Sequence, residues 1–355
     1  MKFFKLAITV LMITSLSVAL NASDKKVYTW KLAQSWGTNF PIFGDAPKNM
    51  AERVKKMSNG RLIIKIDSSN KHKSAFGVFD FVKSGRYEMA HTASYYWKGK
   101  DMNTLFFTTM PFGMIAQEQN AWFYYGGGME LMQEVYGKYG MLSFPGGNTG
   151  NQMGGWFRKE MKTVDDFKGL KMRIPGFAGE VLSKLGASVV NIAPGELYTA
   201  LDRGTIDALE WVGPSLDLMM GFHKVAPFYY TGWHEPATEL QFLVNEKAFA
   251  ELPADLQEIL KQAMKSSAYD MLSQSTHESA MNLAKIKKDF PNVKIKTFSK
   301  EIMAKLKEEN NKLLVEMSNK DPMAKKIIDS QREYMKKIRA WTKISDYAYL
   351  KSDFE

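Results

Sequence analysis

The stretch GELYTALDRGTIDALEWVGP, residues 195–214, holds the pattern that decides the fold. Its spacing predicts a helix over residues 196–203, a glycine just past the helix end, and a short apolar strand over residues 206–209. Glu210 then stands where a buried strand ends, followed by Trp211 and a Gly-Pro stop. Because an ionised carboxylate is costly to bury unless it is paired or bound to a metal, we expect Glu210 to face a ligand.

Residues 79–90 repeat this pattern of helix, glycine, acidic residue and short strand. The repeat places segment 91–95, which ends at Tyr95, after a strand in the first half of the chain, just as Glu210 follows a strand in the second half. Ligands of open α/β sheets bind beyond the C-terminal ends of the strands. Both segments are therefore candidates for the walls of a ligand cleft.

Strand and helix patterns alternate outward from these two stretches, which predicts an α/β fold with two lobes. A turn-rich segment over residues 145–150 separates the two series. The expected strands cover residues 27–33, 61–67 and 87–92, then 152–157, 170–174 and 206–209, and the expected helices cover residues 44–57, 76–83 and 117–136, then 179–185 and 196–203.

The chain is expected to return to its first lobe. Residues 237–244 have the pattern of a strand of the first sheet, and a long helix follows over residues 253–290, with two more helices after it. Crossings near residues 146–150 and 231–236 would permit hinge closure around a ligand. The predicted divisions are lobe I, residues 23–148 with 237–252; lobe II, residues 149–236; and a helical region, residues 253–355, that packs on both lobes.

The N-terminus has the features of a secretory signal peptide over residues 1–22: Lys2 and Lys5, an apolar run over residues 6–20, and small residues at the cleavage position. An uncleaved anchor is the alternative, because Leu20 is imperfect at the third position before the cut. The chain contains no cysteine, which excludes disulfides and thiol chemistry. Export without disulfides suits the bacterial periplasm.

The composition is that of a globular protein, with 45% hydrophobic and 24% charged residues, and 355 residues suffice for about two domains. The net charge of +10 admits nucleic acids or membrane surfaces as partners. The lysines, however, are spread along helical segments with carboxylates between them, which favours solvated helix faces. We therefore expect no nucleic-acid partner.

Signatures of enzymes are missing from the sequence. It has no G-x-S-x-G, H-E-x-x-H, P-loop or dinucleotide-binding motif, and its five histidines show no metal-ligand spacing. The triple glycine at residues 126–128 interrupts a helical pattern without a preceding strand and is interpreted as a turn or kink. A secreted enzyme that uses Glu210 and Glu235 as an acid–base pair stays an alternative.

Three further polar residues stand at the predicted cleft. Arg173 ends a strand before Pro-Gly and suits a carboxylate, with a surface salt bridge as an equal alternative. Gln152 opens the first strand of lobe II, and Glu235 lies at the second crossing; each could ligate a hard cation, or instead bond the main chain or water. Aromatic residues gather at cleft positions too, with a core role as the alternative for each. They are Trp36, Phe40, Tyr95, Tyr96, Trp97, Trp156 and Trp211.

Several motifs resemble those of the solute-binding subunits of tripartite ATP-independent periplasmic (TRAP) transporters, the DctP-like family. The similarity covers the mature chain and is closest to the branch that binds 2-oxo acids, with a lactate-binding relative nearby. It implies a two-lobed periplasmic-binding-protein fold with a ligand cleft at the hinge, and no enzyme activity. The motifs are GNTGNQMGGWFRK at residues 147–159, LKMRIPG at 170–176, MPFGM at 110–114, NAWFYYGGGMEL at 120–131 and the ALEWVGP that ends the opening stretch.

By this resemblance, Arg173 holds the substrate carboxylate, and Gln152, Glu210 and the main chain of Trp211 hold a cation that the substrate also ligates. A 2-oxo acid suits such a site, because one carboxylate oxygen and the adjacent carbonyl oxygen can close a five-membered chelate while the other carboxylate oxygen faces the arginine. Gln152 and Trp211 then border the substrate as well. Selectivity would come from the cation rather than from shape alone.

The resemblance also implies that Glu235 is a further contact of the cation and the substrate, and that Tyr95 contacts the substrate from lobe I. Glu235 also bears on the choice of cation. If both glutamates bind, the site with its monoanion carries two negative charges, which Ca²⁺ neutralises; if Glu210 alone binds, Na⁺ suffices. Because the resemblance is closer to the sodium-using branch, Na⁺ is expected, with Ca²⁺ as the alternative.

The resemblance also implies partners. The receptor would deliver its small 2-oxo carboxylate to membrane permease subunits, and C-terminal helices over residues 325–343 would exchange between the protomers of a homodimer. Two other receptors stay as alternatives: one for a 2-hydroxy acid such as lactate with Ca²⁺, and one that serves a sensor kinase.

Overall fold

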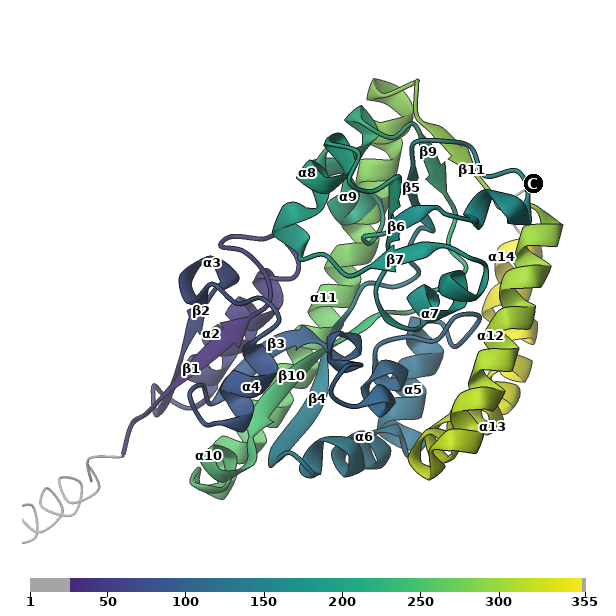
Figure 1. Cartoon of the computed structure of the whole chain (residues 1–355). Helices are drawn as coiled ribbons and strands as arrows, with labels where there is room; N and C mark the ends of the chain where they lie inside the picture. Colours follow the sequence, from purple (N-terminus) through teal and green to yellow (C-terminus); the bar gives the residue numbers. More distant parts are fainter. Residues whose placement is uncertain (1–25, 353–355) are drawn as a thin grey trace, which may run out of the picture.

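The computed structural model describes residues 26–352, so the signal peptide expected over residues 1–22 lies outside the described residues. Two β-sheets flanked by helices organise this part of the chain (Figure 1). The predicted α/β fold with two lobes is confirmed. Within residues 26–352, no helix is long and apolar enough to span a membrane.

The first sheet contains five strands in the order β2-β1-β3-β10-β4. β1, β2 and β3 pair in parallel, whereas β10 is antiparallel to both β3 and β4. β10 is the strand predicted to return to the first sheet, and its return is confirmed. The strands are β1 (Tyr28–Gln34), β2 (Leu62–Asp67), β3 (Met89–Ala93), β4 (Met141–Asn148) and β10 (Glu239–Asn245).

The second sheet contains six short strands in the order β11-β9-β5-β8-β6-β7. At its centre, β8 pairs in parallel with β6 and antiparallel with β5. The sequence patterns did not predict β7, β9 or β11, although they did predict the equally short β5 and β6 within the longer ranges 152–157 and 170–174. The strands are β5 (Gly155–Phe157), β6 (Lys171–Arg173), β7 (Ser188–Val190), β8 (Ala208–Leu209), β9 (Phe228–Tyr230) and β11 (Lys294–Lys296).

The helix, glycine and strand repeat of the sequence is present twice in the structure. α4 (Val78–Lys83) ends before Gly85 and β3, and α8 (Leu197–Asp202) ends before Gly204 and β8. Both glycines have a positive φ, 73° and 70°, which explains the residue type. The other helices and helical turns, except the three described below, are α2 (Asp45–Met57), α3 (Ser69–His72), α7 (Gly176–Lys184), α9 (Pro214–Met220), α10 (Glu246–Ala250), α12 (Lys300–Lys320), α13 (Pro322–Ile344), α14 (Asp346–Ser352), η1 (Ser94–Trp97), η2 (Met102–Phe107), η3 (Val164–Phe167), η4 (Pro194–Glu196) and η5 (Phe222–Lys224).

The helix predicted over residues 117–136 is in fact two helices, α5 (Ala116–Tyr125) and α6 (Gly128–Gly137). The chain breaks between them at Gly126 and Gly127, and Gly127 has a φ of 86°. A residue other than glycine is strained in this left-handed region. The interpretation of the triple glycine as a turn or kink is confirmed.

The turn predicted over residues 145–150 is wrong for most of its length, because residues up to Asn148 continue β4. The glycines there permit close packing rather than a turn. A Cβ atom on Gly147, whose φ is 133°, would lie 2.1 Å from the sulfur of Met271. Helix α11 (Ala254–Asp289) can therefore pass directly over β4.

α11 connects the two sheets. Its 36 residues, about 54 Å long at 1.5 Å per residue, contact α2 and β4 beside the first sheet and α9 beside the second. β11 follows α11 and joins the second sheet. The helical region expected over residues 253–355 also contains this short strand, which the sequence patterns did not indicate. The chain thus passes between the sheets a third time, as Figure 1 shows.

The buried apolar side chains of the two sheets and the C-terminal helices form one continuous cluster. A second cluster lies between the first sheet, α2 and the beginning of α11; Trp30, Met50 and Leu256 belong to it. Continuity of the first cluster across both sheets means that the lobes are in contact where the strand ends meet.

Candidate ligand and cation site

Two neighbouring strands of the second sheet end in opposite charges. Arg173 is the last residue of β6, and Glu210 directly follows β8. The strands run parallel with Arg173 opposite Leu209, so the two charged residues lie at the same edge of the sheet. Both side chains are fully buried. The surface salt bridge considered for Arg173 is therefore wrong.

The guanidinium of Arg173 is held from one side by the main chain. Its Nη1 donates to the carbonyl oxygen of Glu210 at 2.6 Å and lies 3.4 Å from Oε2 of the same residue. Its Nε donates to the carbonyl oxygen of Ile192 at 3.4 Å. Its Nη2 is buried and has no hydrogen-bond partner among residues 26–352. One donor thus stays available to a ligand.

Gln152 and Glu235 lie on the two segments that connect the sheets on either side of the second lobe. The segments run side by side and are joined by two main-chain hydrogen bonds. The N–H of Gln152 donates to the carbonyl oxygen of Glu235 at 2.9 Å, and the N–H of Thr149 donates to the carbonyl oxygen of Thr238 at 3.1 Å. Gln152 was predicted to open a strand, which is wrong because β5 begins at Gly155. Its main chain bonds the neighbouring connection instead of a strand.

Three titratable side chains meet beside this connection. Glu210, His234 and Glu235 each place one ligand atom within 4.8 Å of those of the other two, and His234 Nε2 lies 3.7 Å from Glu210 Oε1. Sequence analysis did not single out His234, because the histidines have no metal-ligand spacing. The only signal was its place beside Glu235, and its approach to Glu210 depends on the folded connection.

Several buried polar atoms of this cluster have no hydrogen-bond partner in the described part of the chain: Oε1 of Gln152, Glu210 and Glu235, Nη2 of Arg173, and both ring nitrogens of His234. Buried polar groups of folded proteins are almost always paired. Oxygen acceptors suit a hard cation such as Na⁺ or Ca²⁺, and a guanidinium donor suits a carboxylate. The atoms present therefore fit a cation together with an organic anion.

Burial dominates the electrostatics of the cluster. It raises the pKa of Glu210 to about 8, against the opposing charge of Arg173. It raises the pKa of Glu235 to about 7, and the charge of Glu210 adds to this shift. It lowers the pKa of His234 to about 4, so this imidazole is neutral at pH 7. Two ionised glutamates are thus unfavourable here without a compensating cation.

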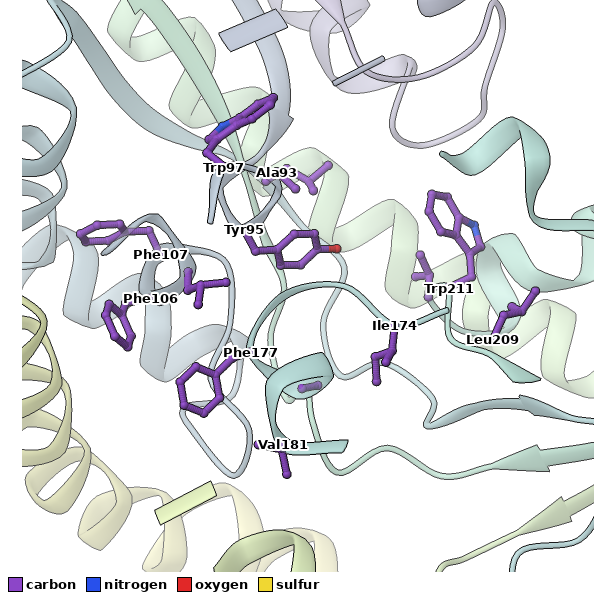
Figure 2. Packing of buried hydrophobic residues seen from close by; sticks show 14 of the residues in the cluster. Ala93, Tyr95, Trp97, Phe106, Phe107, Ile174, Phe177, Val181, Leu209 and Trp211 are labelled. Atoms are coloured by element: carbon purple, nitrogen blue, oxygen red, sulfur yellow. The ribbon is translucent and has the colours of Figure 1, made fainter. Parts of the chain in front are cut away.

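Aromatic side chains of both lobes cover the cluster. Tyr95, in η1, extends from its lobe toward the segment that carries Trp211 (Figure 2). It packs so closely on Gly176 that a Cβ atom there would lie 3.0 Å from the tyrosine ring. Trp211 contacts Phe40 of the first lobe, with 6.0 Å between the ring centroids. The lobes therefore meet over the charged residues.

Three of the aromatic cleft candidates are instead held in the core by their indole N–H groups. Each group donates to a buried side chain, which fixes the ring away from any ligand. Trp36 donates to His91 Nδ1 at 2.9 Å, Trp97 to Gln241 Oε1 at 3.0 Å, and Trp156 to Asp217 Oδ2 at 2.9 Å.

Residues 32–321 match the family model of the bacterial extracellular solute-binding proteins, family 7. The chain belongs to this family. Membership confirms the resemblance to TRAP solute-binding subunits, and this family 7 protein is a solute receptor rather than an enzyme. The alternative of a secreted enzyme, with Glu210 and Glu235 as its acid–base pair, is wrong.

Relatives of this family 7 receptor match nearly its whole length. A TRAP periplasmic solute-binding protein from Colwellia psychrerythraea, solved with bound calcium and pyruvate, is 69% identical, with a TM-score of 0.91 over 92% of this chain and 99% of that one. Another, from Pseudoalteromonas atlantica T6c and solved with sodium and pyruvate, is 68% identical, with a TM-score of 0.92 over 93% and 100%. A monocarboxylate 2-oxoacid-binding periplasmic protein from Nostoc is 40% identical over 321 residues, 90% of this chain and 87% of that one.

Proposed function

We propose that this receptor binds a small 2-oxo monocarboxylate of the pyruvate class together with one metal cation, and delivers the acid to the membrane permease subunits of a TRAP transporter. The observation that carries the proposal is the buried set of unpartnered atoms, in which oxygen acceptors stand beside one guanidinium donor. The relatives support the ligand class, since one is described as 2-oxoacid-binding and two were solved with pyruvate and a cation.

The three unpartnered oxygens and the unpartnered guanidinium nitrogen each receive a role in this proposal. Arg173 binds the carboxylate of the acid through Nη2. Gln152, Glu210 and Glu235 hold the cation through their Oε1 atoms, and the main-chain carbonyl of Trp211 adds a further oxygen. One carboxylate oxygen and the carbonyl oxygen of a 2-oxo acid would chelate the bound cation, whose positive charge attracts them.

Tyr95 and His234 support these contacts in the proposal. Burial and the nearby glutamates raise the pKa of Tyr95, so its hydroxyl stays protonated and can donate to an acid from the opposite lobe. The neutral imidazole of His234 stands 3.7 Å from Glu210 Oε1, and its ring nitrogens stay available to the cation or the acid. The Trp211 ring lies 5.4 Å from the guanidinium carbon of Arg173 and restricts its movement.

We propose Na⁺ as the resident cation, with Ca²⁺ as the alternative. The charge state of Glu235 decides between them. Its Oε2 accepts a hydrogen bond from the Thr238 hydroxyl at 2.6 Å, which leaves Oε1 for the ion. With both glutamates ionised, the site and its acid carry two negative charges and match Ca²⁺. With Glu235 neutral, one negative charge is left for Na⁺.

Calorimetric titration of metal-stripped protein tests the proposal. Pyruvate, 2-oxobutyrate, lactate and acetate are each titrated without added cation, with Na⁺ and with Ca²⁺. We expect binding only when a cation is present, and stronger binding of the 2-oxo acids than of acetate, which cannot form the chelate. Pyruvate binding that ignores every cation, or acetate binding as strong as that of pyruvate, would contradict the proposal.

We further propose that residues 1–22 are cleaved on export to the periplasm, and that the mature receptor forms a homodimer through its C-terminal helices. The relatives named above support the location, because their descriptions place them in the periplasm. Apolar side chains exposed near the C-terminus support the dimer: Trp341, Ile344, Tyr347 and Leu350. Mass spectrometry of the exported protein tests the cleavage site.

A further inference from the structure

A cavity lies outside the cluster of Arg173 and Glu210, between α12, α13 and the loop before α5. Its volume is about 270 Å³, near the lower end of the range for small-molecule sites. The MPFGM segment, residues 110–114, forms one wall. None of the residues assigned above to the acid or the cation lines this cavity.

The lining of the cavity is cationic and apolar, and includes no acidic residue of the described chain. Arg339 is neutralised from behind by Glu118, whose two carboxylate oxygens accept from its Nε and Nη2 at 2.8 and 2.7 Å. Lys307 and Arg332 form no ion pair within the described chain, so two positive charges at the rim are uncompensated. The apolar lining includes Met110, Met114, Leu314, Ile328 and Met335.

A buried amide in the lining is left without a partner. The side chain of Asn310 is 3% exposed, and its Oδ1 makes no hydrogen bond with any of residues 26–352. The other two amides of the lining are engaged, since Gln331 donates to the carbonyl oxygen of Phe106 at 2.8 Å and Gln119 to that of Thr108 at 2.9 Å. An unpaired buried amide is rare in a folded protein, and here it borders a cavity.

We propose that this cavity is a second binding site of the receptor and takes a small amphipathic monoanion, a carboxylate with a short apolar tail. Lys307 and Arg332 bind the carboxylate. The methionines pack around the tail, because their flexible thioether side chains adapt to different shapes. A neutral molecule of the same length would leave both cations unpaired and bind more weakly.

NMR of methyl-labelled methionine tests the site directly, because Met110, Met114 and Met335 line it. The protein is first saturated with pyruvate and cation, so that the first site is filled, and hexanoate is then titrated against 1-hexanol as the neutral probe. We expect these three signals, assigned by Met→Leu variants, to shift saturably, with hexanoate binding at least roughly tenfold more tightly than hexanol. Met219, exposed on α9, should not shift. The same two titrations are repeated without pyruvate. Equal methionine shifts in both series would show that binding in the cavity does not depend on whether the first site is filled.

Two sets of variants complete the test. Lys307→Gln with Arg332→Gln removes the unpaired charges from exposed positions and should lower hexanoate affinity at least roughly tenfold. Lys320→Gln with Lys337→Gln removes equal charge from exposed positions of the same two helices, outside the cavity, and should bind like the wild type.

Three results would overturn this second site: methionine shifts that never saturate, equal affinity for hexanoate and hexanol, or hexanoate affinity unchanged by the loss of Lys307 and Arg332. Calorimetry of pyruvate on every variant reports separately on the first site. Failure of the second site and failure of the proposed function are thus distinguished.

Discussion

Arg173 and Glu210 form a site because each charge is fully buried at the end of a short strand of the second sheet. Burial makes both costly, and the folded chain compensates them only in part. The carbonyl oxygen of Glu210 fixes one edge of the guanidinium at 2.6 Å, so the other edge is oriented before any ligand arrives. Such preorganisation increases affinity, since little side-chain entropy is lost on binding.

Arg173→Lys should weaken pyruvate binding by roughly 10- to 150-fold, the equivalent of one charge-assisted hydrogen bond of about 1.5–3 kcal/mol. Lysine keeps the positive charge. It lacks the planar guanidinium, however, which donates to the Glu210 carbonyl from one edge and to a ligand carboxylate from the other. Calorimetry in the presence of the cation measures the change. Arg158→Lys is the matched control, because Arg158 donates to Leu201 away from the cluster. Unchanged affinity in Arg173→Lys would exclude Arg173 from the site.

His91 should make the protein less stable in mild acid. Its Nδ1 accepts from Trp36 and its Nε2 donates to the carbonyl oxygen of Gly146, both at 2.9 Å, which fixes a neutral ring. Burial lowers its pKa from 6.5 to about 4. Between these values the unfolded chain binds a proton that the folded chain does not. The free energy of unfolding therefore falls by up to about 1.4 kcal/mol per pH unit as the pH drops below 6.5, and this effect is absent above 6.5.

Urea denaturation of wild-type and His91→Gln protein from pH 8 to pH 5 measures this effect. Glutamine can accept from Trp36 and donate to Gly146, but it does not titrate. We expect the stability of the wild type relative to the variant to fall by about 2 kcal/mol between pH 7 and pH 5. A difference that stays constant with pH would show that His91 titrates as it does in the unfolded chain.

At the scale of elements, the contact between β4 and α11 depends on glycine. The strand passes so close beneath the helix that Gly147 has no room for a side chain next to Met271. α11 in turn places β11 beside β9 in the second sheet. One close approach therefore influences the arrangement of both sheets.

Gly147→Ala should lower the free energy of unfolding by about 2–4 kcal/mol, because the new methyl group meets Met271 and the φ of 133° disfavours a side chain. Urea denaturation measures the loss. Gly137→Ala is the control: it lies in α6, its Cβ would meet nothing within 4 Å, and alanine favours a helix. In a Met271→Ala background, which lacks the thioether, Gly147→Ala should cost less than it does in the wild type. Equal stability of the two single variants would contradict this explanation.

The longest helix could be predicted from the sequence, but success with strands did not follow their length. β8, with two residues, lies in a predicted strand, whereas β4, with eight, was missed because its proline and glycines favour a turn. The long helix was predicted over residues 253–290 and observed at Ala254–Asp289, because many turns repeat its signal. β11 is a strand only because β9 lies beside it. In the site, Glu210 was recognisable because a charge that ends an apolar strand is unusual. His234 was missed, because its approach to Glu210 exists only in the folded chain.

At the scale of the whole molecule, three connections join the two sheets: the segment after β4, the segment before β10, and α11. The first two are hydrogen-bonded to each other, so they must bend together when the lobes separate. The third runs along both sheets as one helix (Figure 1). We expect these three connections to restrict movement of the lobes to opening and closing.

The proposed dimer is tested by placing charges on its expected contact surface. Light scattering of the mature protein should give the mass of two chains, and Ile344→Asp with Leu350→Asp should give the mass of one, because buried charges destabilise an apolar interface. Both side chains are exposed in the single chain, so circular dichroism should not change. Met219→Asp, at an exposed position of α9, is the control and should stay dimeric. A wild-type protein with the mass of one chain would contradict the dimer.

The paired connections have a kinetic consequence. Gln152 is bonded to Glu235, and the next residue, Met153, donates to the carbonyl oxygen of Val212 at 2.8 Å, which ties the proposed cation ligands to the second lobe. Only Tyr95 comes from the first lobe, so the ion can bind while the lobes are apart. Under the proposed function, the ion enters first and the acid second. The acid's association rate should then rise and saturate with ion concentration, while the ion's own rate should not depend on the acid.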